Sequence, residues 1–390
     1  MKNKNPHIIY ILTKLELGGA QKVCLTLLKN FKNCSLISGA EGILVSDVKT
    51  DQSVFLIDSF KREVRLLSIF SEIKTFLKMI FKMRSLKKKH PNIIVHTHST
   101  KAGLMGRWSA LFSGIKKRVH TVHGFGFHNH QNKIAWLINF TLEFATSLIT
   151  THYVCVSKED RKIGIKLLLN FKKKSSVIRA AVDYEKFYTP AKLDQSKKIC
   201  QGSIFQETKK NFIIGTVSCL KPQKNIIDLL KAFKLFIDKL STTESKNIKL
   251  QIIGDGIQRK IVEEWISKNK LESKIDLLGW QNDIQKFMNS WDIFAMSSLW
   301  EGLPCAIVEA RLSKLPVIAY KINGIPEIIQ NGKNGFLVKP GNWKLLSQKM
   351  EILFKDFDLL KTMKIHPDDL NEFKNTTMIK QHSNLYQKLL

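Results

Sequence analysis

The residues best suited to chemistry lie in the segment Ser297–Val338. Glu301 and Glu309 are eight residues apart, on either side of the turn Gly302-Leu303-Pro304, which follows an apolar strand. Proline suits the first turn of a helix, where its missing N–H costs no hydrogen bond, so Pro304 predicts a helix start. Free amides at such a start, beside the carboxyl end of a parallel strand, favour phosphate oxygens. Two carboxylates beside an anion site predict a ligand with hydroxyls and phosphates, such as a nucleotide sugar; an ordinary connection with solvated acids is the alternative.

This segment resembles the signature of retaining glycosyltransferases of the GT-B fold, in the large group called family 4, whose C-terminal domains carry two glutamates separated by seven residues. The similarity continues through Asn323–Glu327 and Asn334–Phe336, and further motifs extend it over most of the chain. The resemblance implies that Glu309 holds the donor ribose hydroxyls and that Glu301 orients the donor sugar. It also assigns Gly302-Leu303-Pro304 to donor binding.

Strand-like runs alternate with helical ones along the chain, which is the pattern of parallel sheets with crossover helices. Strands are expected at residues 7–13, 54–57, 93–97, 118–122, 153–156 and 176–179, then at 212–217, 248–253, 274–278, 293–296, 316–319 and 335–338. A chain of 390 residues is also too long for one ordinary core. The expected fold class is therefore α/β, and the resemblance implies GT-B, with two Rossmann-like domains whose parallel sheets face a central cleft.

The domains are expected to divide near a polar, poorly periodic stretch, residues 190–210, which has the character of a linker. Residues 1–190 would form the N-terminal, acceptor-side domain, and residues 191–368 the nucleotide-sugar-binding domain. Residues 369–390 have a helical pattern. In proteins of this resemblance, the last helix crosses back to the N-terminal domain.

Glycine-containing loops follow strands in both halves. Gly18 and Gly19 open the helix after the first strand, and Gly254 begins the loop after residues 248–253. Glycine lets the backbone approach a ligand closely and leaves amides free for a phosphate, although any tight connection can use it. The Gly18–Gly19 loop resembles the Gly-Gly-Ala loop of family 4, which touches the donor diphosphate. We expect Gly254 to lie on the donor side as well.

The first strand of the second half leads into Ser218–Asn225. Family 4 enzymes usually have an arginine near the start of this motif and a lysine near its end, and both neutralise the leaving diphosphate. Lys224 occupies the lysine position, while Cys219 stands where the arginine is expected. A thiol cannot stabilise phosphate charge as a guanidinium does, so Lys221 or a helix N-terminus would carry more of this task. Outside this context, Lys224 would be read as a surface lysine.

Six of the eleven histidines fall between His96 and His130, at spacings that invite a metal interpretation. The carboxylates and cysteines that usually complete such a site are missing nearby. We therefore expect hydrogen-bonded structural roles for His96, His98 and His120.

His123 differs from these histidines because it ends a strand. Family 4 enzymes resemble this arrangement, with a histidine close to the donor sugar, so His123 joins Lys224 and Glu301 in the expected catalytic set. The segment 96–107 also resembles enzymes that build lipid-linked bacterial surface glycans. Ser99, Lys101 and, farther along, His128 are the expected acceptor-side residues.

Neither a metal nor a cofactor is expected. The D-x-D pattern Asp356-Phe357-Asp358 lies in a late helical region and indicates a solvated face. The six cysteines are scattered with no C-x-x-C spacing, which indicates reduced thiols in a cytoplasmic protein.

The chain is strongly basic, with 63 Lys and Arg against 33 Asp and Glu and a net charge of +30. Such a field favours an anionic partner. The segment Lys61–His90 combines basic residues with Leu, Ile, Phe and Met at helical spacing, which is typical of a helix at an anionic membrane surface. A helix that packs its apolar stripe on the sheet and exposes its lysines is the alternative, and both can hold. No nucleic-acid-binding motif is found, so no nucleic acid is expected as a partner.

Together these features predict a retaining, metal-independent hexosyl- or N-acetylhexosaminyltransferase. The donor would be a nucleoside diphosphate sugar, expected to be a UDP-sugar, and the acceptor a membrane-associated glycan on polyprenyl diphosphate, in surface polysaccharide synthesis. The expected location is cytoplasmic, on the inner face of the plasma membrane. A non-hydrolysing UDP-sugar epimerase of the same fold and a basic nucleic-acid-binding protein stay open as alternatives.

Overall fold

The computed structural model describes residues 5–48, 51, 53–61, 69–188 and 211–390. The chain forms two compact units. Unit 1 comprises Met1–Ala181 and Glu372–Leu390, and unit 2 comprises Val182–Asn371, so the chain returns to unit 1 at its C-terminus. The expected linker, residues 190–210, lies outside the described residues, as does part of the expected basic helix, residues 62–68.

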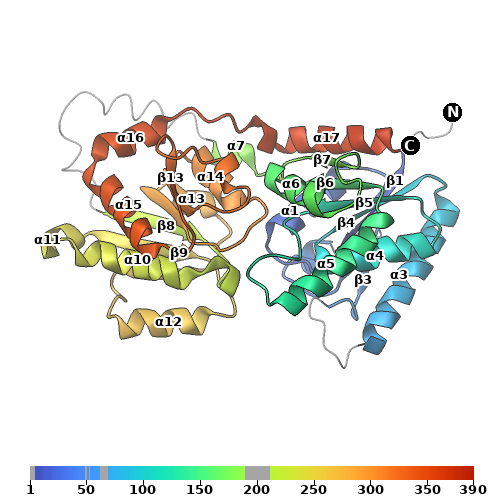
Figure 1. Cartoon of the computed structure of the whole chain (residues 1–390), viewed down its shortest axis with the longest axis horizontal. Coiled ribbons are helices and arrows are strands. Elements are labelled where there is room, and N and C mark those ends of the chain that lie inside the picture. Colours follow the sequence, from blue (N-terminus) through green and yellow to red (C-terminus); the bar gives the residue numbers. More distant parts are fainter. Residues whose placement is uncertain (1–4, 49–50, 52, 62–68, 189–210) are drawn as a thin grey trace. The chain divides into compact units, whose positions relative to one another are not determined.

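Unit 1 is built on a seven-stranded parallel sheet in the order β3-β2-β1-β4-β5-β6-β7 (Figure 1). The strands are β1 His7–Leu12, β2 Cys34–Gly39, β3 Val54–Ile57, β4 Ile93–His98, β5 Lys117–Val122, β6 His152–Cys155 and β7 Ser175–Val177. The helices are α1 Gly19–Asn30, α2 Val45–Val48, α3 Ile69–Lys89, α4 Thr100–Phe112, α5 Lys133–Leu148, α6 Lys158–Leu167 and α17 Asn375–Lys388. β1 and β4 are buried along their whole length, as expected of parallel strands with both faces covered.

Unit 2 has a six-stranded parallel sheet in the order β10-β9-β8-β11-β12-β13. The strands are β8 Phe212–Val217, β9 Ile248–Ile253, β10 Ile275–Gly279, β11 Ile293–Met296, β12 Val317–Tyr320 and β13 Gly335–Val338. The helices are α7 Tyr184–Phe187, α10 Ile226–Asp238, α11 Thr242–Ser245, α12 Arg259–Lys268, α13 Ile284–Met288, α14 Cys305–Leu312, α15 Trp343–Lys355 and α16 Phe357–Ile365. Short 3₁₀ turns are η2 Pro222–Lys224 and η3 Ile325–Glu327 in unit 2, and η4 Asn371–Phe373 where the chain returns to unit 1.

Every expected strand is present, with bounds within two residues of those predicted. The expectation missed β2, whose sequence CSLISG has too few large apolar residues to stand out. Ser35 and Ser38 are nevertheless buried, and Ser35 Oγ is 3.0 Å from His7 Nε2 on β1. β2 therefore lies inside the sheet because its polar side chains find partners or space there, which apolar periodicity cannot reveal.

Helix α3 lies in the basic segment, for which packing on the sheet and contact with a membrane were both expected to be possible. Its buried row packs on the sheet and consists of Thr75, Met79, Ile80, Met83 and Leu86. Phe70, Ile73, Leu77 and Phe81 on the same helix remain exposed. The packed stripe is thus confirmed, while docking to a membrane stays a prediction.

The C-terminal helix α17 packs on unit 1 next to α1 (Figure 1). Tyr386 is its main anchor: the Tyr386 hydroxyl lies 2.6 Å from His96 Nδ1 and 3.3 Å from the Tyr10 hydroxyl. His382, one turn earlier, is buried with its ring centroid 5.6 Å from that of His96. The last helix is therefore part of the core of unit 1.

Within the described residues, none of the helices combines the length and apolarity that a membrane span requires.

Candidate active site

In each sheet the first three strands are added in one direction from the first strand. The next strand then lies on the other side of that first strand, so the strand order reverses. This switch lies between β8 and β11 in unit 2 and between β1 and β4 in unit 1. In open α/β sheets, ligands bind outside the carboxyl ends of the strands at such a point. The predicted site residues follow these four strands in most cases.

Lys224 and Glu301 meet at the switch point of unit 2. Lys224 belongs to η2, after β8, and its Nζ donates a hydrogen bond to Glu301 Oε1 in the loop after β11. Their side chains are 16% and 10% exposed, so the charges are largely but not fully withdrawn from water. A lysine and a carboxylate held together at this edge place opposite charges side by side, and both side chains keep some exposure to solvent.

Backbone contacts fix the loops that carry this pair. Gln223 Nε2 donates to the Trp300 carbonyl at 2.7 Å and lies 3.4 Å from Glu301 Oε2. The Leu299 amide donates to the Gln223 carbonyl at 2.9 Å. Ser297 Oγ donates to the carbonyls of Lys224 and Asn225 at 3.2 and 2.8 Å. Several hydrogen bonds therefore join the two loops, and these bonds fix the positions of Lys224 and Glu301.

Left-handed backbone conformations mark the same edge. Asn225 has φ 47° and Asn323, in the loop after β12, has φ 37°. The Asn225 side chain donates to Asp228 Oδ2 at 2.7 Å, and the Tyr320 hydroxyl donates to the same oxygen at 2.8 Å. Asparagine tolerates this region better than most residues, and such positions gather at functional sites.

The turn Gly302-Leu303-Pro304 is buried and leads into α14. The helix starts at Cys305, so Pro304 is its N-cap residue, with φ −76° and ψ 111°; the expectation that Pro304 lies within the first turn was wrong by one residue. The Gly302 carbonyl accepts from the Gly324 amide at 3.2 Å, which ties this turn to the loop after β12. Glu309 lies on α14 and is 3% exposed.

Gly254 directly follows β9 and has φ 126°, and a side chain there would meet the Ser218 carbonyl at 2.1 Å. Its amide donates to the Gly279 carbonyl at 2.7 Å. The loop after β9 therefore meets the loop after β8 and the end of β10 through backbone atoms, and glycine is required at position 254. Cys219 is half-buried in the loop after β8, so a thiol lies near this edge where the sequence resemblance leads one to expect an arginine.

Ser99 lies at the switch point of unit 1, between β4 and α4. Its hydroxyl is 2.8 Å from Thr13 Oγ1, in the segment after β1. Ser99 has φ 67°, a conformation that costs a non-glycine residue on the order of 1–3 kcal/mol. Backbone strain of this kind gathers at functional sites. Two hydroxyls from neighbouring strand ends thus meet beside the start of a 13-residue helix.

His123 is paired with a histidine of the neighbouring strand. Its Nε2 lies 3.1 Å from His98 Nδ1. Burial, and to a smaller extent the charge of the neighbouring His382, lowers the pKa of His123 to about 4. His98 is fully buried, and desolvation followed by the charge of His123 holds its pKa well below the ordinary value. Both rings are therefore neutral at physiological pH, and one nitrogen of the pair donates to the other.

The other strand histidines make hydrogen bonds within unit 1, as the expected structural role requires. His96 is bonded to Tyr386 and to Thr121 Oγ1, the latter at 2.7 Å, and His120 Nδ1 lies 2.9 Å from Thr97 Oγ1. Within the described ranges, no group of three or more His, Cys, Asp or Glu side chains is placed to hold a metal ion.

The other residues predicted for the site in unit 1 are Lys101, His128, Gly18 and Gly19. Lys101 Nζ donates to Glu72 Oε1 on α3 and to the carbonyl of Lys61, which precedes α3 in the chain, both at 2.6 Å. The His128 amide donates to Gln131 Oε1 at 3.2 Å in the loop before α5. Gly18 caps α1 and Gly19 begins it, so their loop follows β1 as expected.

Sequence reasoning missed two bracing residues, Gln223 and Ser297. Gln223 adjoins Lys224 in the motif, and Ser297 follows β11 directly. A polar residue next to a predicted catalytic lysine, or at the end of a buried strand, is the signal that could have identified them.

Family comparisons agree with this architecture. The profile described as Glycosyltransferase Family 4 matches residues 36–186, and the profile described as Glycosyl transferases group 1 matches residues 202–365. The first match falls mainly in unit 1 and the second in unit 2.

Two similar relatives are bacterial glycosyltransferases. The chain is 34% identical over 328 residues to the UDP-Gal:alpha-D-GlcNAc-diphosphoundecaprenol alpha-1,3-galactosyltransferase of Escherichia coli. The aligned region covers 83% of this chain and 81% of the relative. It is 26% identical over 321 residues to the capsular polysaccharide biosynthesis glycosyltransferase CapM of Staphylococcus aureus, covering 80% and 79%.

Solved structures share the fold. Anabaena Alr3699/HepE, crystallised with UDP and glucose, superposes with a TM-score of 0.78 at 19% identity, covering 98% of this chain and 99% of that one. Sucrose-phosphate synthase from Thermosynechococcus elongatus gives a TM-score of 0.76 at 15% identity, covering 98% of each chain. Two family profiles match the chain, a relative is more than 30% identical along most of its length, and both units have parallel sheets. The chain therefore belongs to the family 4 type of bacterial glycosyltransferases with the GT-B fold.

Proposed function

We propose that the protein transfers a sugar from a UDP-sugar, with retention at the anomeric carbon, to a glycan acceptor on a polyprenyl diphosphate. The observation that carries the proposal is the Lys224–Glu301 ion pair at the β8–β11 switch point. It joins a cation, suited to a diphosphate, to a carboxylate, suited to sugar hydroxyls, on loops that are already braced.

The chemistry needs little from side chains beyond positioning and charge. The bond between the anomeric carbon and the diphosphate oxygen breaks, and its electron pair leaves with the diphosphate. Lys224 and the amides at the start of α14 stabilise that charge. The acceptor hydroxyl attacks from the face that the diphosphate leaves, and its proton passes to the departing phosphate oxygen.

The other site residues have supporting roles in this proposal. Glu301 fixes Lys224 and orients the donor sugar, Glu309 binds the ribose hydroxyls, and Gly254 lets the loop after β9 approach the nucleotide. His123 contacts the sugar as a neutral imidazole, which its lowered pKa supports. Ser99, whose hydroxyl stands at a strained strand end, is a candidate acceptor contact.

The acceptor class rests on the relatives. The Escherichia coli relative is named for a diphosphoundecaprenol acceptor, for UDP-Gal and for an alpha linkage. An alpha product from an alpha-linked UDP-sugar is the outcome of retention. An acceptor of this kind lies in a membrane, so the enzyme would work at the inner face of the plasma membrane.

A donor screen tests this function. The full chain is incubated with each of several labelled UDP-sugars, with and without a short-chain polyprenyl diphosphate-linked GlcNAc, and the product linkage is determined by NMR. We expect acceptor-dependent transfer to an alpha-linked product. A beta-linked product would overturn retention. Conversion of the UDP-sugar without acceptor would instead identify an epimerase.

A further inference from the structure

Helix α5 carries apolar side chains on two sides, unlike an ordinary surface helix. On its inner side, Phe140 and Phe144 pack against the core of unit 1, beside the buried polar residues Glu143, Thr146 and Ser147. A second apolar row is exposed and recurs at helical spacing: Ile134, Leu137, Ile138, Leu142 and Leu148. A surface helix normally has one apolar stripe, which faces the core. α5 has a further apolar stripe that faces outward, with Ile134 73% exposed.

A buried ion pair holds α5 in this orientation. The guanidinium of Arg107, on α4, donates through Nη1 and Nη2 to the two carboxylate oxygens of Glu143 at 2.9 and 2.8 Å. The Tyr153 hydroxyl adds a hydrogen bond to Glu143 Oε1 at 2.8 Å. Rolling α5 to bury its apolar stripe would break this satisfied pair and leave charges buried alone. The outward apolar stripe is therefore built into the fold.

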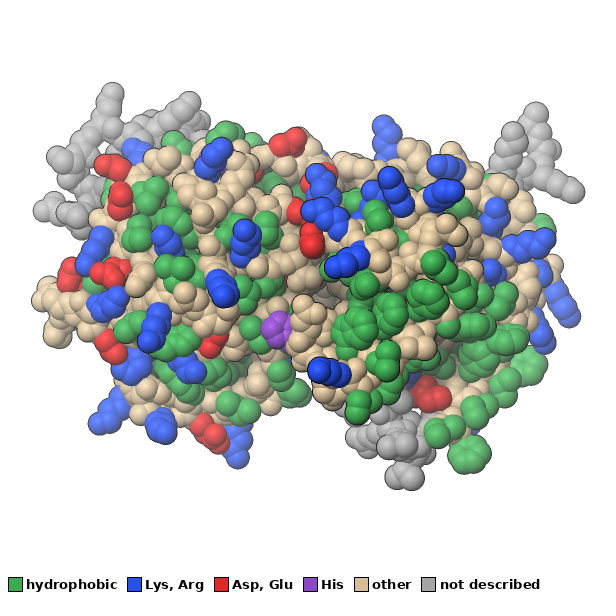
Figure 2. Space-filling model, in the orientation of Figure 1, with side chains coloured by type: hydrophobic (Ala, Val, Ile, Leu, Met, Phe, Trp, Pro, Cys, Tyr) green, Lys and Arg blue, Asp and Glu red, His purple; other side chains and the backbone are tan. Residues whose placement is uncertain are grey.

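The neighbouring helices extend the apolar surface. On α3, Phe70 is 87% exposed, and Ile73, Leu77 and Phe81 follow it at helical spacing. Phe112 at the end of α4 is also exposed. We call this surface of α3, α4 and α5 the apolar face. Figure 2 shows hydrophobic side chains gathered over the region in which Figure 1 labels these helices. A contiguous patch of this kind marks an interaction site.

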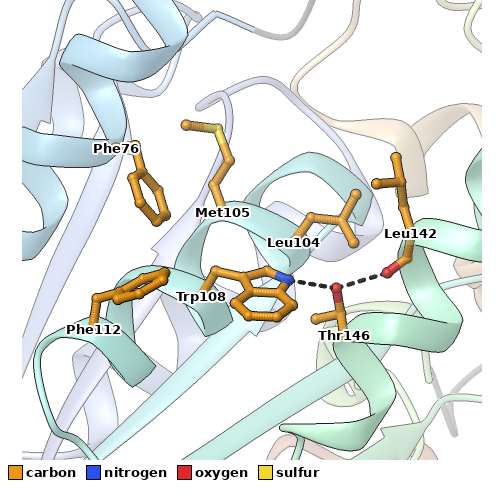
Figure 3. A pocket seen from close by; sticks show the side chains of 7 residues that line it. All are labelled: Phe76, Leu104, Met105, Trp108, Phe112, Leu142 and Thr146. Carbon is orange, nitrogen blue, oxygen red and sulfur yellow. Dashed lines mark hydrogen bonds between the residues drawn. The ribbon is translucent and has the colours of Figure 1, made fainter.

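The apolar face contains a groove of about 260 Å³ between the three helices (Figure 3). Phe76 of α3, Trp108 and Phe112 of α4, and Leu142 of α5 line it. Its polar atoms are bonded to one another: Trp108 Nε1 donates to Thr146 Oγ1 at 2.9 Å, and that hydroxyl donates to the Leu142 carbonyl at 2.7 Å. The groove thus has an apolar lining that suits hydrocarbon.

Basic side chains surround the apolar face, and their charge indicates an anionic partner. α3 has seven basic residues and one acidic residue, Glu72, which Lys101 neutralises at 2.6 Å. Lys74 and Lys78 are exposed next to the apolar row of α3, and Lys133 begins α5. Apolar side chains flanked by cations match a bilayer with anionic headgroups, because hydrocarbon and phosphate are both within reach.

We propose that the apolar face inserts into an anionic lipid bilayer, and that hydrocarbon chains of that bilayer fill the groove between α3, α4 and α5. The inference extends the proposed function on its acceptor side, because it brings unit 1 to the surface that would hold a lipid-linked acceptor. The test below contains no sugar donor, so the two proposals can fail separately.

The test is flotation of the full chain with vesicles of equal parts phosphatidylcholine and phosphatidylglycerol, compared with vesicles of phosphatidylcholine alone. The variant is Ile134→Ser with Ile138→Ser, two exposed positions outside the candidate site. The matched control is Ile257→Ser with Ile261→Ser, two exposed isoleucines of unit 2. Far-UV circular dichroism and thermal melting establish that each variant folds.

We expect the wild type and the unit 2 control to float with the anionic vesicles, and more weakly at raised salt. The Ile134/Ile138 variant should lose about tenfold or more in partition coefficient, because two apolar side chains no longer enter hydrocarbon. Wild-type binding by that variant, or no vesicle binding by the wild type, would overturn the proposal. A dimer that this variant dissociates, without vesicle binding, would assign the face to a second copy instead.

The groove has a separate readout. Brominated acyl chains quench tryptophan fluorescence at contact, so they should quench the wild type, and the quenched fraction should fall in Trp108→Phe. Equal quenching in both proteins would show that hydrocarbon does not reach the groove, which would overturn that part of the proposal.

Discussion

Lys224 and Glu301 are 77 positions apart in the chain and meet because β8 and β11 are neighbours in the sheet. Each lies in a loop whose backbone is fixed by the other: Gln223 bonds to Trp300, and Ser297 to Lys224 and Asn225. The pair is therefore positioned before any donor binds. Such preorganisation is what charge stabilisation in a transition state requires.

Substitutions of Glu309 and Glu301 should affect different kinetic constants. Glu309→Ala should raise the donor KM by about tenfold, since hydrogen bonds to a charged group are worth about 1.5–3 kcal/mol. Glu301→Ala should mainly lower kcat, by about 100-fold, because the alignment of the sugar and of Lys224 matters most in the transition state. Steady-state kinetics of both variants would measure this.

The control for this pair is Glu264→Ala, which removes an exposed carboxylate on α12 and should leave both constants unchanged. Wild-type kinetics in both the Glu301 and Glu309 variants would show that the site lies elsewhere.

At the scale of elements, α4 and α5 are joined by the buried Arg107–Glu143 pair. Arg107→Met should lower the free energy of unfolding by about 3–5 kcal/mol, because Glu143 would stay buried without its partner. Urea unfolding followed by circular dichroism measures this loss. Lys234→Met removes a partly exposed pair with Asp238 and should have little effect. Equal stability of the Arg107 and Lys234 variants would mean that the buried pair does not hold α5.

The sequence predicted elements well where their apolar pattern is strong, as in β1, β8 and β11. It failed at β2, which buries Ser35 and Ser38 within a sheet. It also gave no sign that α5 buries Glu143 against Arg107, 36 positions away, and leaves an apolar row exposed. Lys101 likewise pairs with Glu72 on another helix. Local pattern cannot show partners that only the tertiary fold brings together.

At the scale of the whole molecule, the C-terminal helix completes a buried histidine cluster in unit 1. Burial lowers the pKa of His382 to about 4, and His123 has a similarly lowered pKa. Both groups titrate near 6.5 in the unfolded chain. As the pH falls from about 6.5 to about 4, the unfolded chain binds protons that the folded chain does not, so the free energy of unfolding falls with pH.

The expected slope is at most about 1.4 kcal/mol per pH unit for each such histidine. Urea unfolding at several pH values between 8 and 4 measures it, and His382→Leu should flatten the curve, whereas the exposed His130→Leu should not. A free energy of unfolding that is the same at neutral pH and near pH 5 would contradict the neutral, buried state of this cluster.

The catalytic importance of Lys224 is the centre of this account, and one measurement tests it directly. With the UDP-sugar and lipid-linked acceptor identified by the donor screen, kcat/KM for transfer is compared between wild type, Lys224→Met and the exposed-surface control Lys260→Met. Loss of the cation that stabilises the departing diphosphate should lower kcat/KM by about 100-fold or more in Lys224→Met and leave Lys260→Met unchanged. A folded Lys224→Met variant that transfers sugar at the wild-type rate would contradict the account.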